Sequence, residues 1–362
     1  MTFDTPEETF DRIVARLKLG KRLTDEQVSE TGVLSALLAD GNRMITWIIN
    51  DNGGTFPSPN VYFVDGTDVN AFAFKEDEEY FIGINEGTVL LLMKLFYRML
   101  SHRDILPQIG DLSKEVSPPK SPDIDINEAT QKKREESIFP VDSTRSQFAV
   151  ALTYFAFRFI LMHEYAHILK GHVDYLENKT GLAMVSDNEN LTEDVGGDWI
   201  RQAIEIDADD YSAQIGYYFH IAILIDLNNR GTQTKDGLNT PEIASFAWYF
   251  SISALFRLVG SKGYSPNNFF TSLYPPPAIR TYFIGFVLQQ LNIQEKYKFP
   301  DSSLNASFEC EKAFAILSSE PDFYSSRLAY GPRSDEYINS IFERFEPLYE
   351  ILWPFSILKR GK

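Results

Sequence analysis

The chain has 362 residues, enough for two or three domains of ordinary size or for one large domain with insertions. Its 34 Lys and Arg against 51 Asp and Glu give a formal net charge of −17, and no basic stripe offsets it, so we expect no binding to nucleic acid. Hydrophobic residues make up 44% and aromatic residues 14%, which excludes a largely disordered chain. The single cysteine, Cys310, excludes an intrachain disulfide and a cysteine-based zinc site, and it fits a reducing compartment.

Apolar runs in the chain are too short to predict a membrane span. The N-terminal stretch is acidic at its start and has no uninterrupted apolar run, unlike a signal peptide. The longest uncharged apolar runs, Gly216–Ile225 and Ile243–Phe256, are shorter than the roughly 18–20 residues that a spanning helix needs. We expect buried core helices, no transmembrane segment and a cytoplasmic location.

The predicted elements, in chain order, are helices, then a small sheet, then more helices. Residues 6–39 show helical spacing in two segments, the second starting at Thr24. Short β-branched or aromatic runs between turn residues predict strands at Met44–Ile49, Val61–Val64, Asn70–Phe74 and Tyr80–Ile84. Helical patterns follow at Gly87–Ser101, Phe148–Leu169, 198–227, 241–259, 277–291, 307–317 and 333–352.

Two charged stretches interrupt these elements. Residues 107–145 are rich in charge, and four prolines fall within Pro107–Pro122. Such a stretch is either a surface insertion without fixed structure or a lid. A second, acidic stretch at residues 177–197 predicts a loop between two long helices.

The sequence His163-Glu164-Tyr165-Ala166-His167 is an HExxH motif. On a helix, positions i and i+4 share one face, so both imidazoles can reach one metal ion. Glu164 is placed to take a proton from a metal-bound water. The preceding turns are almost wholly apolar, so Glu164 is a carboxylate in an apolar element, which is costly without a functional partner.

A catalytic zinc ion, Zn²⁺, needs a third protein ligand and an open fourth position. The downstream helix contains Glu205-Ile206-Asp207-Ala208-Asp209, in which Glu205 and Asp209 share a face. We assign Glu205 as the third ligand. Asp209 then becomes the group that accepts a ring N–H from a ligand histidine and fixes its tautomer.

These motifs resemble the gluzincin metallopeptidases, in which HExxH and a glutamate on a second helix bind zinc. The stretch Asn70–Ala73 (NAFA), with Tyr80–Ile84 and Gly87 after it, is similar to a segment of the HtpX and CAAX-prenyl-protease branch in which NAFA is followed by a strand and a helix. That branch's transmembrane helices are missing here, so the chain looks closer to soluble relatives such as the Lit-type phage-exclusion cell-death peptidases. The ImmA/IrrE regulatory peptidases are a more distant resemblance. The resemblance to the gluzincins as a whole covers residues 60–100, 148–213 and 270–285.

Residues Tyr274–Arg280 resemble the HPPxxxR signature of the same branch, with Tyr274 in place of its histidine. By that resemblance Arg280 lies near the active site and steadies either a substrate carbonyl or Asp209. Tyr274 either donates to an oxyanion, as a phenol can, or is only part of a turn. His172 lies nine residues after His163, the wrong spacing for a metzincin ligand, and is interpreted as a helix-end histidine facing the helix dipole.

The predicted fold class is α+β: a mostly helical zincin-like metallopeptidase domain with a small sheet beside the active-site helix. Its organisation is an N-terminal helical segment at 1–40, the metallopeptidase domain at 41–300 with the insertion 107–145, and a C-terminal helical extension at 301–362 packed on the same domain. We expect the edge strand to be Tyr80–Ile84, binding an extended substrate peptide through Tyr80, Ile82 and Ile84.

Three functions compete. The first is a zinc-dependent endopeptidase acting on a specific cytoplasmic protein, in a toxin or phage-defence setting, with Glu164 deprotonating a zinc-bound water. The second is a general quality-control metallopeptidase. The third is a zinc-binding sensor module without turnover, against which the intact Glu164 argues. The expected partner is a protein or peptide substrate.

Overall fold

The computed structural model describes residues 4–115, 138–181, 184–186, 198–229, 240–259, 274–294, 303–317 and 332–358. The chain is mostly helical with one small mixed sheet, so the α+β class is confirmed. By internal contacts it divides into two compact units, each built from discontinuous segments. Unit 1 comprises Met1–Val89, Ile160–Ala208 and Glu343–Lys362, and unit 2 comprises Leu90–Phe159 and Asp209–Phe342. The domain boundaries expected at residues 40 and 300 stay predictions.

Unit 1 begins with three helices and a sheet. The helices are α1 (Pro6–Leu17), α2 (Asp25–Thr31) and α3 (Val33–Asp51), and both α1 and α2 start with a threonine capping box, at Thr5 and Thr24. The strands are β1 (Asn60–Val64), β2 (Ala71–Glu76), β3 (Glu79–Asn85) and β4 (Met184–Ser186). The predicted strand at Met44–Ile49 is wrong, because those residues lie inside α3.

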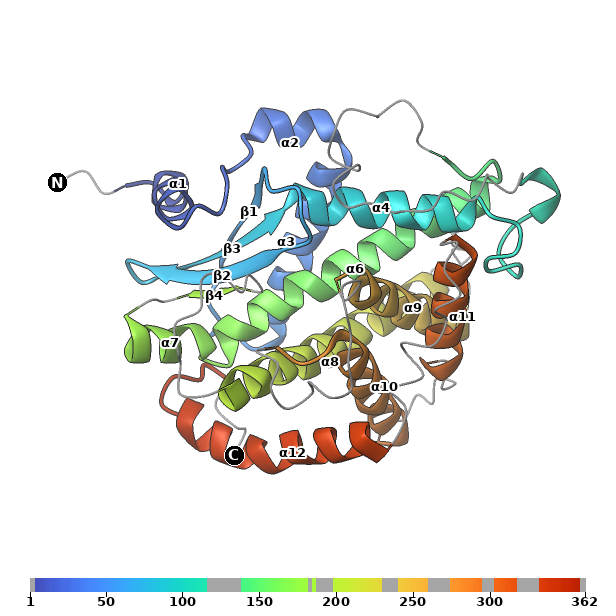
Figure 1. Ribbon diagram of the computed structural model, residues 1–362. Helices are drawn as coiled ribbons and strands as arrows, with labels where there is room; N and C mark the ends of the chain where they lie inside the picture. Colours follow the sequence, from blue (N-terminus) through green and yellow to red (C-terminus); the bar gives the residue numbers. More distant parts are fainter. Residues whose placement is uncertain are drawn as a thin grey trace. The chain divides into compact units, whose positions relative to one another are not determined.

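The strand order is β1-β3-β2-β4, which Figure 1 shows in blue with β4 in green. β3 pairs in parallel with β1 and antiparallel with β2, so it has a partner on each side. The expectation that Tyr80–Ile84 is the edge strand is therefore wrong. Its backbone donors and acceptors are used within the sheet, and Ile82 and Ile84 are fully buried. The edges among the described strands are β1 and β4.

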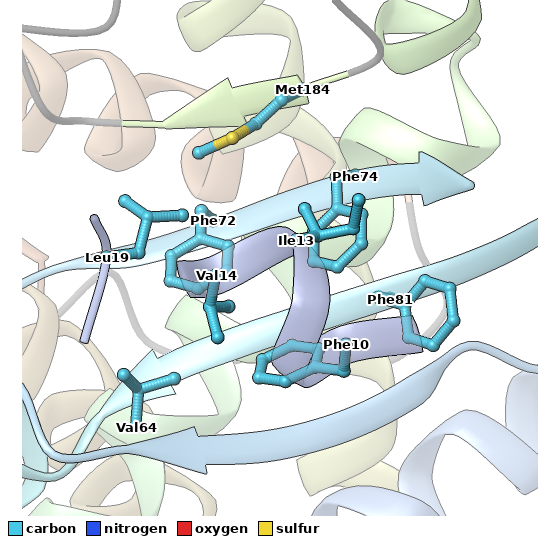
Figure 2. Packing of buried hydrophobic residues seen from close by; sticks show 9 residues of the cluster. All are labelled: Phe10, Ile13, Val14, Leu19, Val64, Phe72, Phe74, Phe81 and Met184. Atoms are coloured by element: carbon cyan, nitrogen blue, oxygen red, sulfur yellow. The ribbon is translucent and has the colours of Figure 1, made fainter. Parts of the chain in front are cut away.

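One face of the sheet packs on α1. Phe10, Ile13 and Val14, spaced along one side of that helix, contact the rings of Phe72, Phe74 and Phe81, as Figure 2 shows. Gly83, opposite Phe72 in the register, makes room for that ring, because a Cβ there would collide with it. This aromatic layer fixes the N-terminal helix to the sheet.

Apart from α7, which was not predicted, the remaining helices follow the predicted order closely. They are α4 (Glu86–Leu100), α6 (Ser143–Leu169), α7 (His172–Thr180), α8 (Asp198–Asn229), α9 (Pro241–Val259), α10 (Pro277–Gln294), α11 (Ser303–Leu317) and α12 (Pro332–Leu352). The loop predicted at 177–197 is wrong where the stretch contains the end of α7 and β4, and residues 182–183 and 187–197 lie outside the described residues. Cys310 on α11 is a buried thiol.

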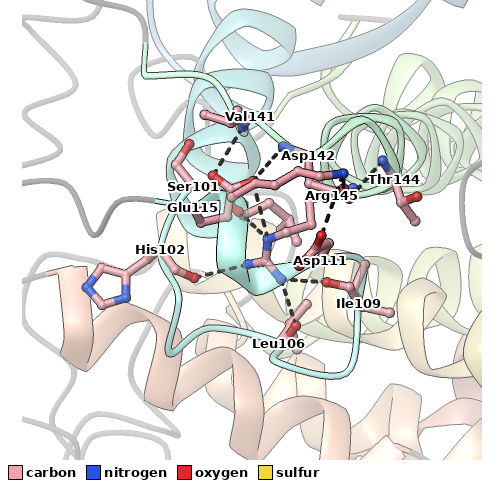
Figure 3. Close-up of polar contacts among 12 residues, drawn as sticks. Ser101, His102, Leu106, Ile109, Asp111, Glu115, Val141, Asp142, Thr144 and Arg145 are labelled. Carbon is pink, nitrogen blue, oxygen red and sulfur yellow. Dashed lines mark hydrogen bonds and ion pairs between the residues drawn. The ribbon is translucent and has the colours of Figure 1, made fainter.

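Both described ends of the stretch 107–145 are packed into unit 2. Arg145 is fully buried, and its guanidinium donates to the carbonyl oxygens of Leu100, His102, Ile105, Leu106 and Ile109 at 2.6–3.0 Å. Figure 3 shows this arrangement, with Glu115 accepting from the backbone of Val141 and Asp142. These ends therefore have fixed structure, whereas residues 116–137, the rest of the predicted insertion or lid, lie outside the described residues.

Helix α9 has the composition of a membrane span over one 18-residue window, Glu242–Val259, with a mean hydropathy of 1.2. The protein buries 72% of that window. A core helix of a folded domain has the same length and composition, so this feature does not establish a membrane-spanning segment.

Candidate metal centre

The two histidines of the HExxH motif lie near the C-terminal end of α6, within unit 1. Their spacing of four residues brings their rings to one side of the helix, with the two Nε2 atoms 3.1 Å apart. Both side chains are buried, at 3% exposure for His163 and 1% for His167. The apolar composition of α6 accounts for this burial, since Leu161, Met162 and Ala166 around the motif are fully buried.

Glu205 on α8 completes the group, as the sequence predicts. Its Oε2 lies 3.2 Å from His163 Nε2 and its Oε1 lies 3.8 Å from His167 Nε2. Zinc–ligand bonds of about 2.0–2.1 Å place neighbouring corners of a tetrahedron about 3.3–3.4 Å apart. The Nε2–Nε2 and Nε2–Oε2 separations are close to this spacing, and one ligand atom from each of the three residues lies within 4.8 Å of the others. Two imidazole nitrogens with a carboxylate are a donor set that suits zinc.

This is the one such group that the described part of the chain contains. A search for three or more His, Cys, Asp or Glu side chains whose donor atoms converge finds only His163, His167 and Glu205 there, all buried. Glu164, the expected general base, follows His163 directly on α6 and is 2% exposed. Burial of a carboxylate one residue from His163 is typical of a functional site rather than of a solvated helix face.

His167 also contacts another buried histidine, His172. His167 Nδ1 is 2.9 Å from His172 Nδ1, and His172 Nε2 is 3.2 Å from Asp207 Oδ2. His172 and Asp207 are both fully buried. We call this series His167–His172–Asp207 the hydrogen-bond relay.

The relay admits one arrangement of protons when His167 binds a metal. A ligating Nε2 carries no proton, so the His167 proton lies on Nδ1 and is donated to His172 Nδ1. His172 then carries its own proton on Nε2 and donates it to Asp207. Burial lowers the pKa of His172, with Asp207 opposing it, which favours the neutral ring that this arrangement needs.

Asp207 is held as a carboxylate by three donors. Besides His172, the ammonium of Lys170 lies 2.9 Å from Oδ1 and the hydroxyl of Tyr349 donates to the same oxygen at 3.0 Å. Burial alone would raise the pKa of Asp207, but Lys170 and His172 together hold it well below its usual range. The relay therefore ends on a charged, fully partnered group.

These contacts correct the interpretation of His172. The residue is the first of α7, and its ring lies between His167 and Asp207 instead of facing a helix dipole at the surface. The carboxylate that ends the relay is Asp207, whereas the sequence predicted Asp209 as the partner of a ligand histidine. The signal for it in the sequence is an acidic residue placed directly between two apolar residues, Ile206 and Ala208.

Asp209 and Arg280 form a pair within unit 2. Arg280 Nε and Nη2 donate to the two carboxylate oxygens of Asp209 at 2.7 and 2.8 Å, and both residues are buried. Of the two partners expected for Arg280, Asp209 is the one that it contacts here, and the fork geometry is that of a strong bidentate pair. Asp209 lies one turn beyond Glu205 on α8. Its action on a ligand histidine stays a prediction.

The other expected site residues are not brought into this group by the described contacts. Tyr274 precedes α10 and is partly buried, and its catalytic role stays a prediction, as does a contact of Arg280 with substrate. The Tyr80 hydroxyl donates to Asp174 on α7 at 2.7 Å, so it ties the sheet to that helix.

Comparison of the chain with protein-family models, with characterised proteins and with solved structures finds no match. The function of the protein is therefore proposed from the HExxH motif and from the geometry of the site.

Proposed function

We propose that this protein is a zinc-dependent peptidase in which His163, His167 and Glu205 hold the ion and Glu164 is the general base. The observation that supports this proposal is the convergence of three buried side chains from an HExxH helix and a second helix, with ligand atoms that lie within 4.8 Å of one another. Three protein ligands leave a fourth position open, as catalytic zinc sites do, whereas structural zinc sites are closed by four.

A zinc ion held by these ligands would polarise a substrate carbonyl and lower the pKa of a bound water. Glu164 removes a proton from the attacking water and delivers it to the leaving amine, which is the part that general acid–base catalysis assigns to such a carboxylate. The relay keeps His167 Nε2 free of a proton, so that this nitrogen is available as a ligand.

The proposed substrate is a peptide bond of a protein, by the resemblance of the motifs to the gluzincins. A toxin or phage-defence setting and a general quality-control role are both compatible with this site. Because β3 has no unpaired edge, a substrate peptide does not add as a strand along Tyr80, Ile82 and Ile84.

The test compares cells that express the wild-type protein with cells that express Glu164→Gln, and it measures new protein N-termini by mass spectrometry. Glu164→Gln keeps the side-chain size and removes the base, so cleavage should fall by about 10²–10⁴-fold while zinc binding is retained. Glu30→Gln, on the exposed surface of α2, is the matched control and should cleave as the wild type does.

Equal sets of new N-termini from the wild-type protein and Glu164→Gln would contradict a peptidase. Zinc binding without any new N-termini in either would favour the sensor module instead.

A further inference from the structure

The C-terminal end of the chain contacts the relay directly. Tyr349, in the last turn of α12, donates its hydroxyl to Asp207 Oδ1 at 3.0 Å. The Lys170 ammonium, 2.9 Å from the same oxygen, lies 5.7 Å from the centre of the Tyr349 ring. Tyr349 therefore contacts both the Asp207 carboxylate, which ends the relay, and the Lys170 ammonium, which is paired with that carboxylate.

The segment that follows Tyr349 is bound to the end of the HExxH helix. The backbone N–H groups of Ile357 and Leu358 both donate to the Leu169 carbonyl oxygen, at 2.9 and 3.1 Å. This carbonyl is in the last turn of α6, where no further helical N–H is available to it. The C-terminal segment thus supplies the donors that end α6 two residues beyond His167.

The junction between α6 and α7 is shaped to accept this segment. Gly171 has a φ of 81°, which favours glycine, and a Cβ there would collide with the backbone of Phe355. The Phe355 ring packs against Tyr175 of α7, with ring centres 5.9 Å apart. Residues 349–358, which we call the C-terminal strap, therefore lie against the turn that carries His172.

We propose that docking of the C-terminal strap sets the affinity of the metal centre, through Tyr349 on Asp207 and the relay to His167. A docked strap fixes the orientation of Asp207, hence the tautomer of His172, hence the free Nε2 of His167. By linkage, a metal ion that favours this arrangement strengthens docking of the strap by the same factor. This inference rests on the proposed metal centre and assigns a regulatory contact to it.

The primary test is the zinc dissociation constant of Tyr349→Phe, measured by competition with a chromophoric chelator. Loss of the hydroxyl should weaken zinc binding by about tenfold, the lower end of the effect of residues that orient metal ligands. The matched control is Tyr282→Phe, which removes a hydroxyl that donates to Asp335 at the other end of α12. It should bind zinc within about twofold of the wild type.

A second variant loosens the strap without touching the relay. Ile357→Pro removes one N–H donor to Leu169 and should also weaken zinc binding, although Tyr349 is unchanged. Hydrogen exchange at Leu358 gives the reciprocal readout: zinc should slow exchange in the wild-type protein and slow it less in Tyr349→Phe.

Wild-type zinc affinity in both Tyr349→Phe and Ile357→Pro would overturn the inference and leave the metal centre standing. Absence of zinc binding by the wild-type protein would overturn the metal centre and the inference with it.

Discussion

Replacement of Asp207 by asparagine changes one atom of the relay and removes its charge. The carboxylate accepts three hydrogen bonds, from His172, Lys170 and Tyr349. An amide offers one oxygen and one donor group. If the oxygen faces His172, the NH₂ group meets the Lys170 ammonium and the Tyr349 hydroxyl, and the charged hydrogen bond to Lys170 is lost.

The opposite orientation has a different cost. With the NH₂ group facing His172 Nε2, that nitrogen must accept, so the His172 proton moves to Nδ1. His167 Nδ1 must then accept in turn, and the His167 proton moves to Nε2, where it blocks metal binding. Either orientation loses a charge-assisted hydrogen bond or the correct tautomer, about 1.5–3 kcal/mol. We therefore expect Asp207→Asn to weaken zinc binding by about 10–100-fold.

The assay is chelator competition for zinc, together with thermal unfolding of the metal-free protein to show that the variant folds. The control is Asp174→Asn, because Asp174 likewise accepts from a lysine and a tyrosine, Lys75 at 3.0 Å and Tyr80 at 2.7 Å. Asp174 contacts no ligand histidine through these bonds, so its variant should keep wild-type affinity. Equal zinc affinity in folded Asp207→Asn and Asp174→Asn would refute the relay argument.

Three further predictions concern stability. Arg145→Met removes the guanidinium hydrogen bonds to five carbonyl oxygens, so it should lower the free energy of unfolding by at least about 4 kcal/mol in urea denaturation; Arg16→Met, at an exposed position of α1, should cost under about 0.5 kcal/mol, and similar costs for the two would contradict the structure. Burial raises the pKa of Glu311 although Arg257 opposes it, so the folded protein binds that proton more tightly than the unfolded chain and the contribution of Glu311 to stability falls as pH rises. Glu311→Gln should therefore gain stability relative to the wild type between about pH 4.5 and about pH 7, and a difference independent of pH would be the contrary result. Zinc at about 1,000 times its dissociation constant should stabilise the wild-type protein by about 4 kcal/mol in calorimetry, whereas an unchanged melting temperature would show that the folded state does not bind it preferentially.

The long helices were predictable because their apolar content is continuous. Helix α6 is apolar over most of its length, and the HExxH spacing reports on a helix face, so the pairing of His163 with His167 followed directly. Glu205 was predictable from a different cue, a pair of acids four residues apart on the next long helix.

The errors arose where local composition and tertiary contacts disagree. Met44–Ile49 is β-branched and aromatic and follows Asp40-Gly41-Asn42, which reads as a turn, yet it forms the second half of α3. The buried positions Leu34, Leu37, Met44 and Ile48 have helical spacing across that apparent turn. The helical period is therefore visible only when residues on both sides of the apparent turn are considered together.

The order of the strands and the relay could not be predicted from the sequence, because both depend on contacts between distant segments. A parallel partner such as β1 can join either side of a hairpin, and no local pattern decides between β2 and β3. The relay joins residues 167, 172 and 207, and Tyr349, which donates to Asp207, is 142 residues from it along the chain. Burial of Asp207 becomes visible only when all of these segments are in place.

The central claim is that His163, His167 and Glu205 form one zinc site, and the most direct measurement is the zinc content of the purified protein. The wild type should carry about one zinc per chain, and Glu205→Gln and His163→Gln should each carry far less after dialysis at a fixed zinc concentration. His220→Gln, in a buried histidine that contacts Arg158 within unit 2, should still retain zinc like the wild type. Full zinc occupancy in His163→Gln, or loss of zinc in His220→Gln alone, would contradict the site.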